Sequence, residues 1–183
     1  FHLAQDFYWW DPTRLPTPAQ WVTIKRVRAK DAINKLFWFS KSPNPKADNR
    51  KVRQEYSKAM RVTLAKGTNV GKRTSGHDVS EHFHKDNGGS IPPNLLAVSN
   101  SISQETYSQF CEDSGINTHP ARIHSLIPEF FIRMLTDEGD EVLDPFAGSC
   151  VTGAVAERLK RNWVCCEINR EYLTGALGRF IDL

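Results

Sequence analysis

The clearest indication of the fold is the segment Asp144-Pro145-Phe146-Ala147-Gly148-Ser149-Cys150-Val151-Thr152-Gly153. It follows a short apolar segment, Glu141 to Asp144, that predicts a buried strand, and it leads into a predicted helix over Val151 to Arg161. In an open α/β sheet such a turn lies at the carboxyl end of its strand, where nucleotide-like ligands bind. Gly148 lets the backbone approach a ligand closely because it has no Cβ. A turn that serves only helix–strand packing remains an alternative reading of these residues.

The residues on both sides of the turn extend the pattern. Apolar side chains at helical spacing predict a helix over Leu126 to Leu135, and a strand from Trp163 to Glu167 and a helix from Glu171 to Phe180 follow the turn. This order predicts an α/β fold with a parallel, doubly wound sheet. Glu167 ends its strand 23 residues after Asp144, near where an acidic residue of dinucleotide folds binds ribose hydroxyls. The chain has neither a G-x-G-x-x-G nor a P-loop pattern, which argues against nicotinamide, flavin and P-loop chemistry.

The first part of the chain predicts strands, and the middle predicts an insertion. His2 to Trp10, Trp21 to Arg28 and Ile33 to Ser40 have the apolar character of strands. From residue 41 to about 118, Pro, Asn, Lys, Ser and Gly dominate, with one helical candidate over Asn49 to Leu64. We therefore expect an inserted module of irregular structure between two parts of one α/β domain.

Two groups of motifs resemble the amino-specific DNA methyltransferases. DPFAGS at 144–149 and RNWVCCEINREYL at 161–173 are similar to motifs I and II of that family. HPARIHSLIPEFFIRMLTDEGDEVLDPFAGS at 119–149 resembles the block in which motif X directly precedes motif I, an order that belongs to the permuted, beta-type arrangement. The resemblance is strong over 119–180 and moderate over 1–50, through FYWWDPTRLPTP and FWFSKSPNPKADNR. The intervening residues fall where the family places its variable target-recognition module.

The resemblance implies a Rossmann-like methyltransferase sheet that binds S-adenosylmethionine. Residues 1–40 would belong to the sheet, 41–118 to a target-recognition insert and 119–183 to the part that binds the cofactor. Glu167 would take the ribose hydroxyls, Ile168 would pack on the adenine, and Ser125 would supply a motif X contact. The implied cofactor-binding set is Asp144, Pro145, Phe146, Ala147, Gly148, Ser149, Glu167, Ile168 and Ser125.

The chain departs from the family pattern at two positions. Cys150 stands where the family usually has a second small residue, Gly or Asn, which puts the affinity for the cofactor in doubt. The motif X signature Arg-Phe-Pro is here Arg122-Ile123-His124, so a proline that would fix a φ angle before the helix is lost.

The family's catalytic tetrapeptide, a polar residue followed by Pro-Pro and an aromatic residue, is not found. Asp11-Pro12-Thr13 lacks the second proline, and Ile91-Pro92-Pro93-Asn94 lacks both the polar first residue and the aromatic last one. The permuted order places the motif before Phe1, so we assign no catalytic residue and expect a C-terminal fragment. A chain without the strand that carries this motif would be marginally stable and would not methylate DNA by itself.

The implied activity is transfer of a methyl group from S-adenosylmethionine to an exocyclic amino group of DNA. The form of motif X favours N4 of cytosine slightly over N6 of adenine. The expected partners are double-stranded DNA and a cognate restriction endonuclease. An RNA methyltransferase and a non-catalytic DNA-binding remnant remain alternatives.

Charge is distributed unevenly along the chain. The net charge of +3 divides into +3 over residues 1–40, +8 over 41–73 and −8 over 74–183. A local +8 suits a surface that faces phosphates, although a solvated basic loop would have the same composition. The residues that we expect to contact DNA are Lys41, Lys46, Arg50, Lys51, Arg53, Lys72 and Arg73.

Composition indicates a soluble globular protein. No apolar run approaches the roughly 18 residues that span a bilayer, and we expect no membrane partner. The four cysteines have no disulfide or zinc-knuckle spacing, which favours reduced thiols in the cytoplasm. His77, His82 and His84, with Cys111 or His119, match no tight zinc pattern, so we expect no metal.

Overall fold

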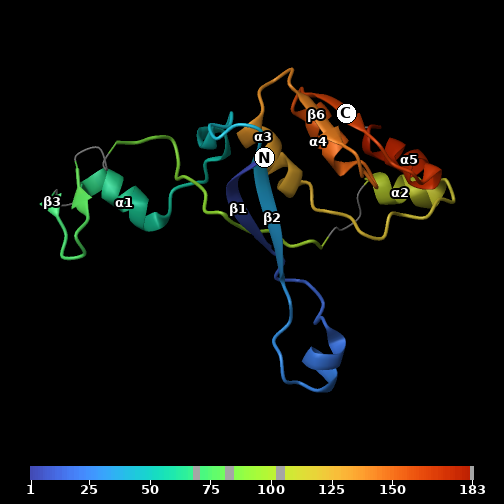
Figure 1. The fold of residues 1–183 in the computed structure, drawn as a ribbon, viewed down its shortest axis with the longest axis horizontal. Coiled ribbons are helices and arrows are strands. Elements are labelled where there is room, and N and C mark those ends of the chain that lie inside the picture. The colour runs from blue at the N-terminus through green and yellow to red at the C-terminus, as the bar shows by residue number, and fades with distance from the viewer. Residues whose placement is uncertain (68–70, 81–84, 102–105, 182–183) are drawn as a thin grey trace. The chain divides into compact units, whose positions relative to one another are not determined.

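A computed structural model of the chain describes residues 1–67, 71–80, 85–101 and 106–181. It divides into two compact units, one formed by residues 1–48 and 93–183 and the other by residues 49–92. We call these the sheet unit and the insert unit. Figure 1 shows their helices and strands, and each unit is described separately.

The predicted strand–turn–helix–strand segment forms a parallel pair of strands in the sheet unit. β6 (Glu141–Asp144) and β7 (Asn162–Cys165) pair in parallel, from Glu141 opposite Asn162 to Asp144 opposite Cys165. α4 (Val151–Arg158) connects them and packs against both strands and against α3 (Leu126–Leu135) (Figure 1). This arrangement confirms the predicted parallel α/β unit.

A small apolar core holds α3, α4 and β7 together. Its buried members come from α3, from α4 and from the residue that follows α4, and partly buried side chains such as Trp163 of β7 complete it. Each fully buried aliphatic side chain of this size contributes about 1.5–3 kcal/mol through removal from water. The buried members are Ile132, Val151, Val155, Ala156 and Leu159.

The N-terminal strands form a second sheet in the same unit. β1 (His2–Trp10) pairs antiparallel with β2 (Ile33–Ser40) and parallel with β5 (Leu95–Ala97). Trp9 and Leu96 are buried against Ile127 of α3. α3 therefore contributes to the cores on both β1 and α4.

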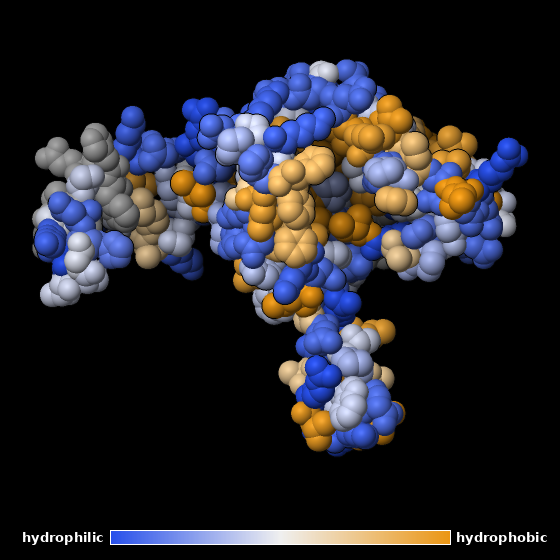
Figure 2. Space-filling view, viewed as in Figure 1, coloured by the Kyte–Doolittle hydropathy of each residue, from blue (hydrophilic) through white to orange (hydrophobic). Residues whose placement is uncertain are grey.

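Apolar side chains of β2 remain on the surface of the sheet unit. Ile33, Phe37 and Phe39 alternate along the strand and are each more than half exposed, and Figure 2 shows the apolar surface that gathers over this strand. Within the described part of the chain, no helix is long and apolar enough to span a membrane.

Two helices and a short 3-10 turn pack together beside the β6–β7 pair. α2 (Thr106–Asp113) contacts α5 (Arg170–Ala176) and η4 (Leu177–Arg179). Tyr107 and Cys111 of α2 are fully buried in this contact. Gly178 permits the close approach, because a Cβ there would lie 2.6 Å from the Cβ of Phe110.

The insert unit contains η2 (Asn49–Val52), α1 (Lys58–Lys66) and the short pair β3 (Gly71–Lys72) and β4 (Asp78–Val79). The single helix predicted over Asn49 to Leu64 is thus wrong. The chain between η2 and α1 is extended because Gln54 pairs with Ser90 through two backbone hydrogen bonds. α1 begins afresh where the hydroxyl of Ser57 accepts a hydrogen bond from the N–H of Met60, 3.2 Å away.

Two further sequence predictions differ from the structure. The strand predicted from Trp21 to Arg28 is wrong: Gln20–Ile24 form the short π-helical turn η1, which starts where Trp21 and Val22 donate to the carbonyl of Pro18. The insert unit is also narrower than the 41–118 insert, because β5 and α2 pack within the sheet unit. The target-recognition role of the insert unit stays a prediction.

Candidate functional site

The turn after β6 has a closed backbone geometry. A side-chain oxygen of Asp144 accepts a hydrogen bond from the N–H of Phe146, 3.0 Å away. The N–H of Ala147 donates to the carbonyl of Cys166 across 2.9 Å, which ties the turn to the end of β7. Gly148 has a φ of +52°, a conformation that favours glycine.

Glu167 lies against this turn, as its place at the end of the second strand predicts. One carboxylate oxygen accepts a hydrogen bond from the N–H of Asn169 (2.9 Å) and the other from the N–H of Gly148 (2.8 Å). These two backbone N–H groups hold the pKa of Glu167 below its usual range, so the side chain is ionised at neutral pH. Each oxygen keeps a lone pair for a further donor.

Two apolar side chains stand in the open beside Glu167. Phe146 is 88% exposed and Ile168 is 99% exposed, although the turn residues Ala147, Gly148 and Ser149 are buried. Exposed apolar groups next to a hydrogen-bonding carboxylate form a surface that could cover a flat heteroaromatic ligand and bind its polar groups.

His119, in the segment between α2 and α3, packs against the turn. A Cβ on Gly148 would lie 3.1 Å from its ring, and the ring packs edge-on against Tyr172 with centroids 4.5 Å apart. Sequence reasoning considered His119 only as a metal ligand and missed this role. Its position at the start of the 119–149 motif block was the available signal.

Arg179 holds the backbone of the same turn from η4. Its Nε donates to the carbonyl of Ser149 across 2.5 Å and its Nη2 lies 3.1 Å from the Ser149 hydroxyl. The guanidinium also lies over the ring of Tyr107, 4.4 Å from the centroid. Ser149 is thereby held inside the protein, and nothing in the sequence signalled the contribution of Arg179.

The thiols of Cys150 and Cys165 lie together beside Gly153, with Cys150 buried and Cys165 half-buried. Cys150 has a φ of +56°, which explains why Gly or Asn suits this position, since both tolerate the left-handed conformation. Burial and the neighbouring Cys150 raise the pKa of Cys165 to about 12. Both thiols stay protonated at neutral pH, because burial also raises the pKa of Cys150.

Ser125 precedes α3 but does not cap it with its side chain. The N–H of Leu126 instead donates to the ring of His124 across 3.2 Å. The cofactor contact expected of Ser125 stays a prediction.

A second polar site lies at the carboxyl end of β1. It is a pocket of about 400 Å³. Asp11 in this pocket is only 7% exposed, and one of its oxygens accepts hydrogen bonds from Thr13 and from the N–H of Asn100. Burial raises the pKa of Asp11, but these hydrogen bonds outweigh it and hold the pKa below its usual range. The lining residues are Trp9, Asp11, Arg14, Asn34, Asn100, Ala121, Arg122 and Ile123.

The side chain of Asn100 leaves one acceptor of this pocket unsatisfied. Its Nδ2 donates to the carbonyl of Arg122 across 2.9 Å, whereas its buried Oδ1 has no hydrogen-bond partner among the described residues. A buried acceptor without a donor costs free energy, roughly 1–3 kcal/mol, that a bound N–H or O–H group would recover. In the sequence, only Asp11-Pro12-Thr13 points to this pocket, and it does not match the catalytic tetrapeptide.

The predicted DNA-contacting residues are divided between the units. Lys41 and Lys46 belong to the sheet unit, and the other five belong to the insert unit. Lys46 forms ion pairs with Asp137 (2.8 Å) and Asp140 (2.5 Å), and these carboxylates raise its pKa. Its charge is therefore offset locally, which weakens the case for a phosphate contact at this residue.

The histidine-rich segment is only partly described. His82 and His84 lie outside the described residues, and within the described ranges no group of three metal-ligating side chains comes together.

Comparison with known proteins identifies the family. The family model of the N6/N4 methyltransferases, described as DNA methylase, matches residues 1–177. The type II methyltransferase M.PvuII of Proteus hauseri is 49% identical over 185 residues, which cover 100% of this chain and 55% of that protein. M2.DpnII of Streptococcus pneumoniae is 44% identical over 61 residues, 33% of this chain and 23% of that protein. The chain thus spans about half the length of M.PvuII.

Two solved structures have the same fold. The cytosine-N4-specific PvuII DNA methyltransferase matches with a TM-score of 0.76 and 41% identity over 100% of this chain and 52% of that one. The complex of M1.HpyAVI with SAM matches with a TM-score of 0.56 and 21% identity over 98% of this chain and 62% of that one, which supports the fold alone. The strand–turn–helix unit around Gly148, the second sheet and these matches agree: the chain belongs to the DNA methylase family.

Proposed function

We propose that the intact protein transfers a methyl group from S-adenosylmethionine to an exocyclic amino group of DNA, with N4 of cytosine as the favoured target. The hydrogen bond from Gly148 to Glu167 is the observation that carries this proposal. It places an ionised carboxylate beside the turn at the ends of two adjacent parallel strands, where such sheets bind nucleotide-like ligands. The identity to M.PvuII supports the choice of cytosine N4.

The residues around the turn fit S-adenosylmethionine by their chemistry. Glu167 has acceptor capacity for the two ribose hydroxyls. Phe146 and Ile168 supply the exposed apolar surface that the adenine ring requires. When bound, the cofactor supplies the electrophilic methyl group of its sulfonium, and this chain supplies the surface that orients it.

We infer that the pocket at the end of β1 receives the amino group of the target base. The unsatisfied Oδ1 of Asn100 can accept one hydrogen from such a group, and the ionised Asp11 makes the pocket favour donors. A base reaches such a pocket only when it is turned out of the duplex, because its amino group is otherwise paired. Asp11 itself is held by Thr13 and Asn100, so we assign it a positioning role.

Duplex DNA is the proposed partner, and a cognate restriction endonuclease is proposed from the type II name of M.PvuII. The protein would act in the cytoplasm, on the DNA there. The experiment is to incubate the intact protein with S-adenosylmethionine labelled in its methyl group and with DNA or RNA. Label in DNA supports the proposal, whereas label confined to RNA, or no label in either, contradicts it.

A further inference from the structure

The insert unit holds one turn rigidly against the segment before α1. Residues 86–89 read Asp-Asn-Gly-Gly, and Gly88 and Gly89 have φ values of +77° and +138°. A Cβ on Gly89 would lie 2.7 Å from the carbonyl oxygen of Gln54, so only glycine fits this approach. Backbone hydrogen bonds of 3.0 and 2.9 Å between Gln54 and Ser90 close the turn onto the opposing segment.

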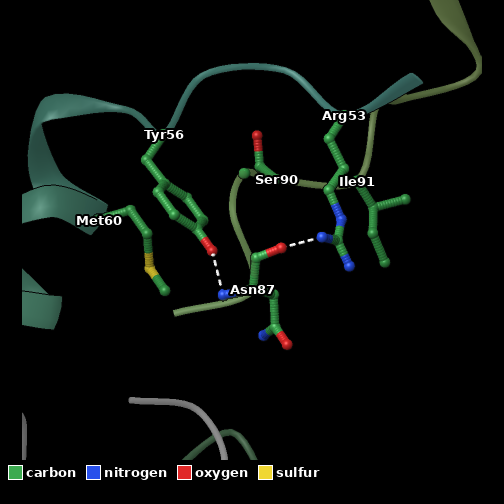
Figure 3. A pocket seen from close by; sticks show the side chains of 7 residues that line it. Arg53, Tyr56, Met60, Asn87, Ser90 and Ile91 are labelled. Atoms are coloured by element: carbon green, nitrogen blue, oxygen red, sulfur yellow. Dashed lines mark hydrogen bonds between the residues drawn. The ribbon is translucent and has the colours of Figure 1, made fainter. Parts of the chain in front are cut away.

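The turn over residues 86–89 exposes the side chain of Asn87 at the surface of the insert unit. Its N–H donates to the hydroxyl of Tyr56 across 2.9 Å, and its carbonyl accepts from Nη1 of Arg53. Figure 3 shows both contacts. The side-chain Nδ2 donates to the carbonyl of Lys85 across 3.0 Å. The exposed amide of Asn87 is thus fixed in place and keeps one N–H and its Oδ1 for another molecule.

An apolar pocket adjoins this amide. It has a volume of about 510 Å³ and is lined by residues of the insert unit alone, chiefly Tyr56, Met60 and Ile91 with Arg53 and Asn87. Figure 3 shows Tyr56 and Met60 on one side, Arg53 and Ile91 on the other, and Asn87 between them. An amide with one free donor and one free acceptor therefore lies directly beside an apolar hollow.

We propose that this pocket reads an A·T base pair from the major groove of DNA. Adenine presents N7 and the N6 amino group there, which together match the free N–H and Oδ1 of an asparagine amide. The paired thymine presents its methyl group next to them, and this group would enter the hollow beside Met60 and Ile91. The minor groove presents neither N7 nor the methyl group, so it does not fit.

The charge of the insert unit agrees with a DNA partner. Residues 49–92 contain nine basic and four acidic side chains, a net charge of +5 in a chain whose total is +3. Phosphate contacts give affinity without sequence information, whereas contacts to base edges give specificity. The inference rests on the proposed function, and it assigns Asn87 to specificity, with Tyr56 and Arg53 as residues that position it.

The test is a binding selection with the intact protein from a pool of randomised DNA duplexes, without cofactor, followed by methyl transfer to the selected duplexes. The variants are Asn87→Ala and Asn87→Asp, and Asn49→Ala is the control, since Asn49 is exposed in the same unit and does not line the pocket. At one A·T position we expect Asn87→Ala to reduce discrimination roughly 5- to 150-fold, and Asn87→Asp to shift the preference toward cytosine.

Modified bases at that position give an independent readout. In the parent protein, 7-deazaadenine should weaken binding roughly 3- to 10-fold, because it removes the acceptor N7. Deoxyuridine in place of thymidine should weaken binding about fourfold, because one methyl group is lost from an apolar pocket. Asn87→Ala should abolish the first effect and Met60→Ala the second, whereas Asn49→Ala should keep both.

Three outcomes would overturn the proposal: unchanged preferences in Asn87→Ala, a parent protein that selects no base at any position, or equal loss of binding to all duplexes in both Asn87 variants. Failure of the proposed function is distinguishable, because the selection would then show base preferences without any methyl transfer.

Discussion

The carboxylate of Glu167 accepts a hydrogen bond from the backbone N–H of Gly148 across 2.8 Å, although the two residues lie 19 positions apart. This bond joins the segment after β7 to the turn after β6, and Phe146 and Ile168, next along the chain to these two segments, are exposed. The same group therefore supports the turn and would bind the ribose of the cofactor.

Glu167→Gln should weaken the binding of S-adenosylmethionine by the intact protein. A hydrogen bond to a charged acceptor contributes roughly 1.5–3 kcal/mol, which corresponds to about a 10- to 150-fold increase in Kd. Isothermal titration calorimetry measures this change. Glu141→Gln, at the other end of the neighbouring strand, is the matched control and should leave Kd unchanged.

The same variant tests the sign of a pH effect. Because the pKa of Glu167 is lower in the folded protein than its ordinary value of 4.5, its contribution to stability is complete above about pH 4.5. This contribution is lost as the pH falls through the folded-state pKa. As the pH falls from 5, the parent protein should therefore lose more free energy of unfolding than Glu167→Gln. Denaturant unfolding at each pH measures this loss, and equal losses in the two proteins would contradict the assignment.

Gly148→Ala should destabilise the turn more than Gly139→Ala. Both residues have positive φ, so both substitutions add backbone strain of roughly 1–2 kcal/mol. Only at Gly148 does the new Cβ meet the ring of His119, at 3.1 Å, whereas nothing lies within 4 Å at Gly139. Urea unfolding should show the larger loss of unfolding free energy for Gly148→Ala. Combining Gly148→Ala with His119→Ala should make that loss smaller, because the new Cβ no longer meets the ring.

Asn100→Ala should lower kcat and leave the Kd of S-adenosylmethionine nearly unchanged. The variant removes the unsatisfied acceptor that we propose binds the target amino group. Asn100 lines the pocket of Asp11 and not the turn of Gly148, so the cofactor surface is left unchanged. Loss of one such acceptor should cost roughly 10-fold or more in kcat. Steady-state methyl transfer separates kcat from KM, and an unchanged kcat would remove Asn100 from the target site.

Lys41→Ala and Lys46→Ala should differ in their effect on DNA binding. Lys46 is already paired with Asp137 and Asp140, whereas Lys41 is exposed and forms no ion pair with the residues that the structure describes. A lost phosphate contact lowers the slope of log K against log salt by about one. We expect this change for Lys41→Ala and no change for Lys46→Ala, measured by fluorescence anisotropy between low and moderate salt.

The turn and its neighbouring strand could be predicted because their pattern is local. Asp144, Gly148 and Glu167 fall within one strand–helix–strand unit, whose handedness and ligand-binding edge follow from general rules. The pocket at the end of β1 could not, since Asn100 and Asp11 are 89 residues apart and meet only when β5 pairs with β1. Arg179 reaches Ser149 from η4 in the same way.

The errors in the sequence predictions also have a physical cause. The apolar residues around Trp21 alternate like a strand but pair with no strand among the described residues, and the carbonyl of Pro18 instead accepts the hydrogen bonds that start a helical turn. The helix predicted from Asn49 ends early because Gln54 pairs with Ser90, 36 residues away. Periodicity does not register such long-range pairing.

Identification of the methylated nucleoside distinguishes a cytosine-N4 methyltransferase from the alternatives. The intact protein is incubated with duplex DNA and S-adenosylmethionine, the DNA is digested to nucleosides, and these are separated by mass-spectrometric chromatography. We predict N4-methylcytosine in the parent protein and a strong reduction in Asn100→Ala. N6-methyladenine in its place would contradict the assignment of the target, and unmodified DNA together with undisturbed binding of S-adenosylmethionine would contradict the proposed activity.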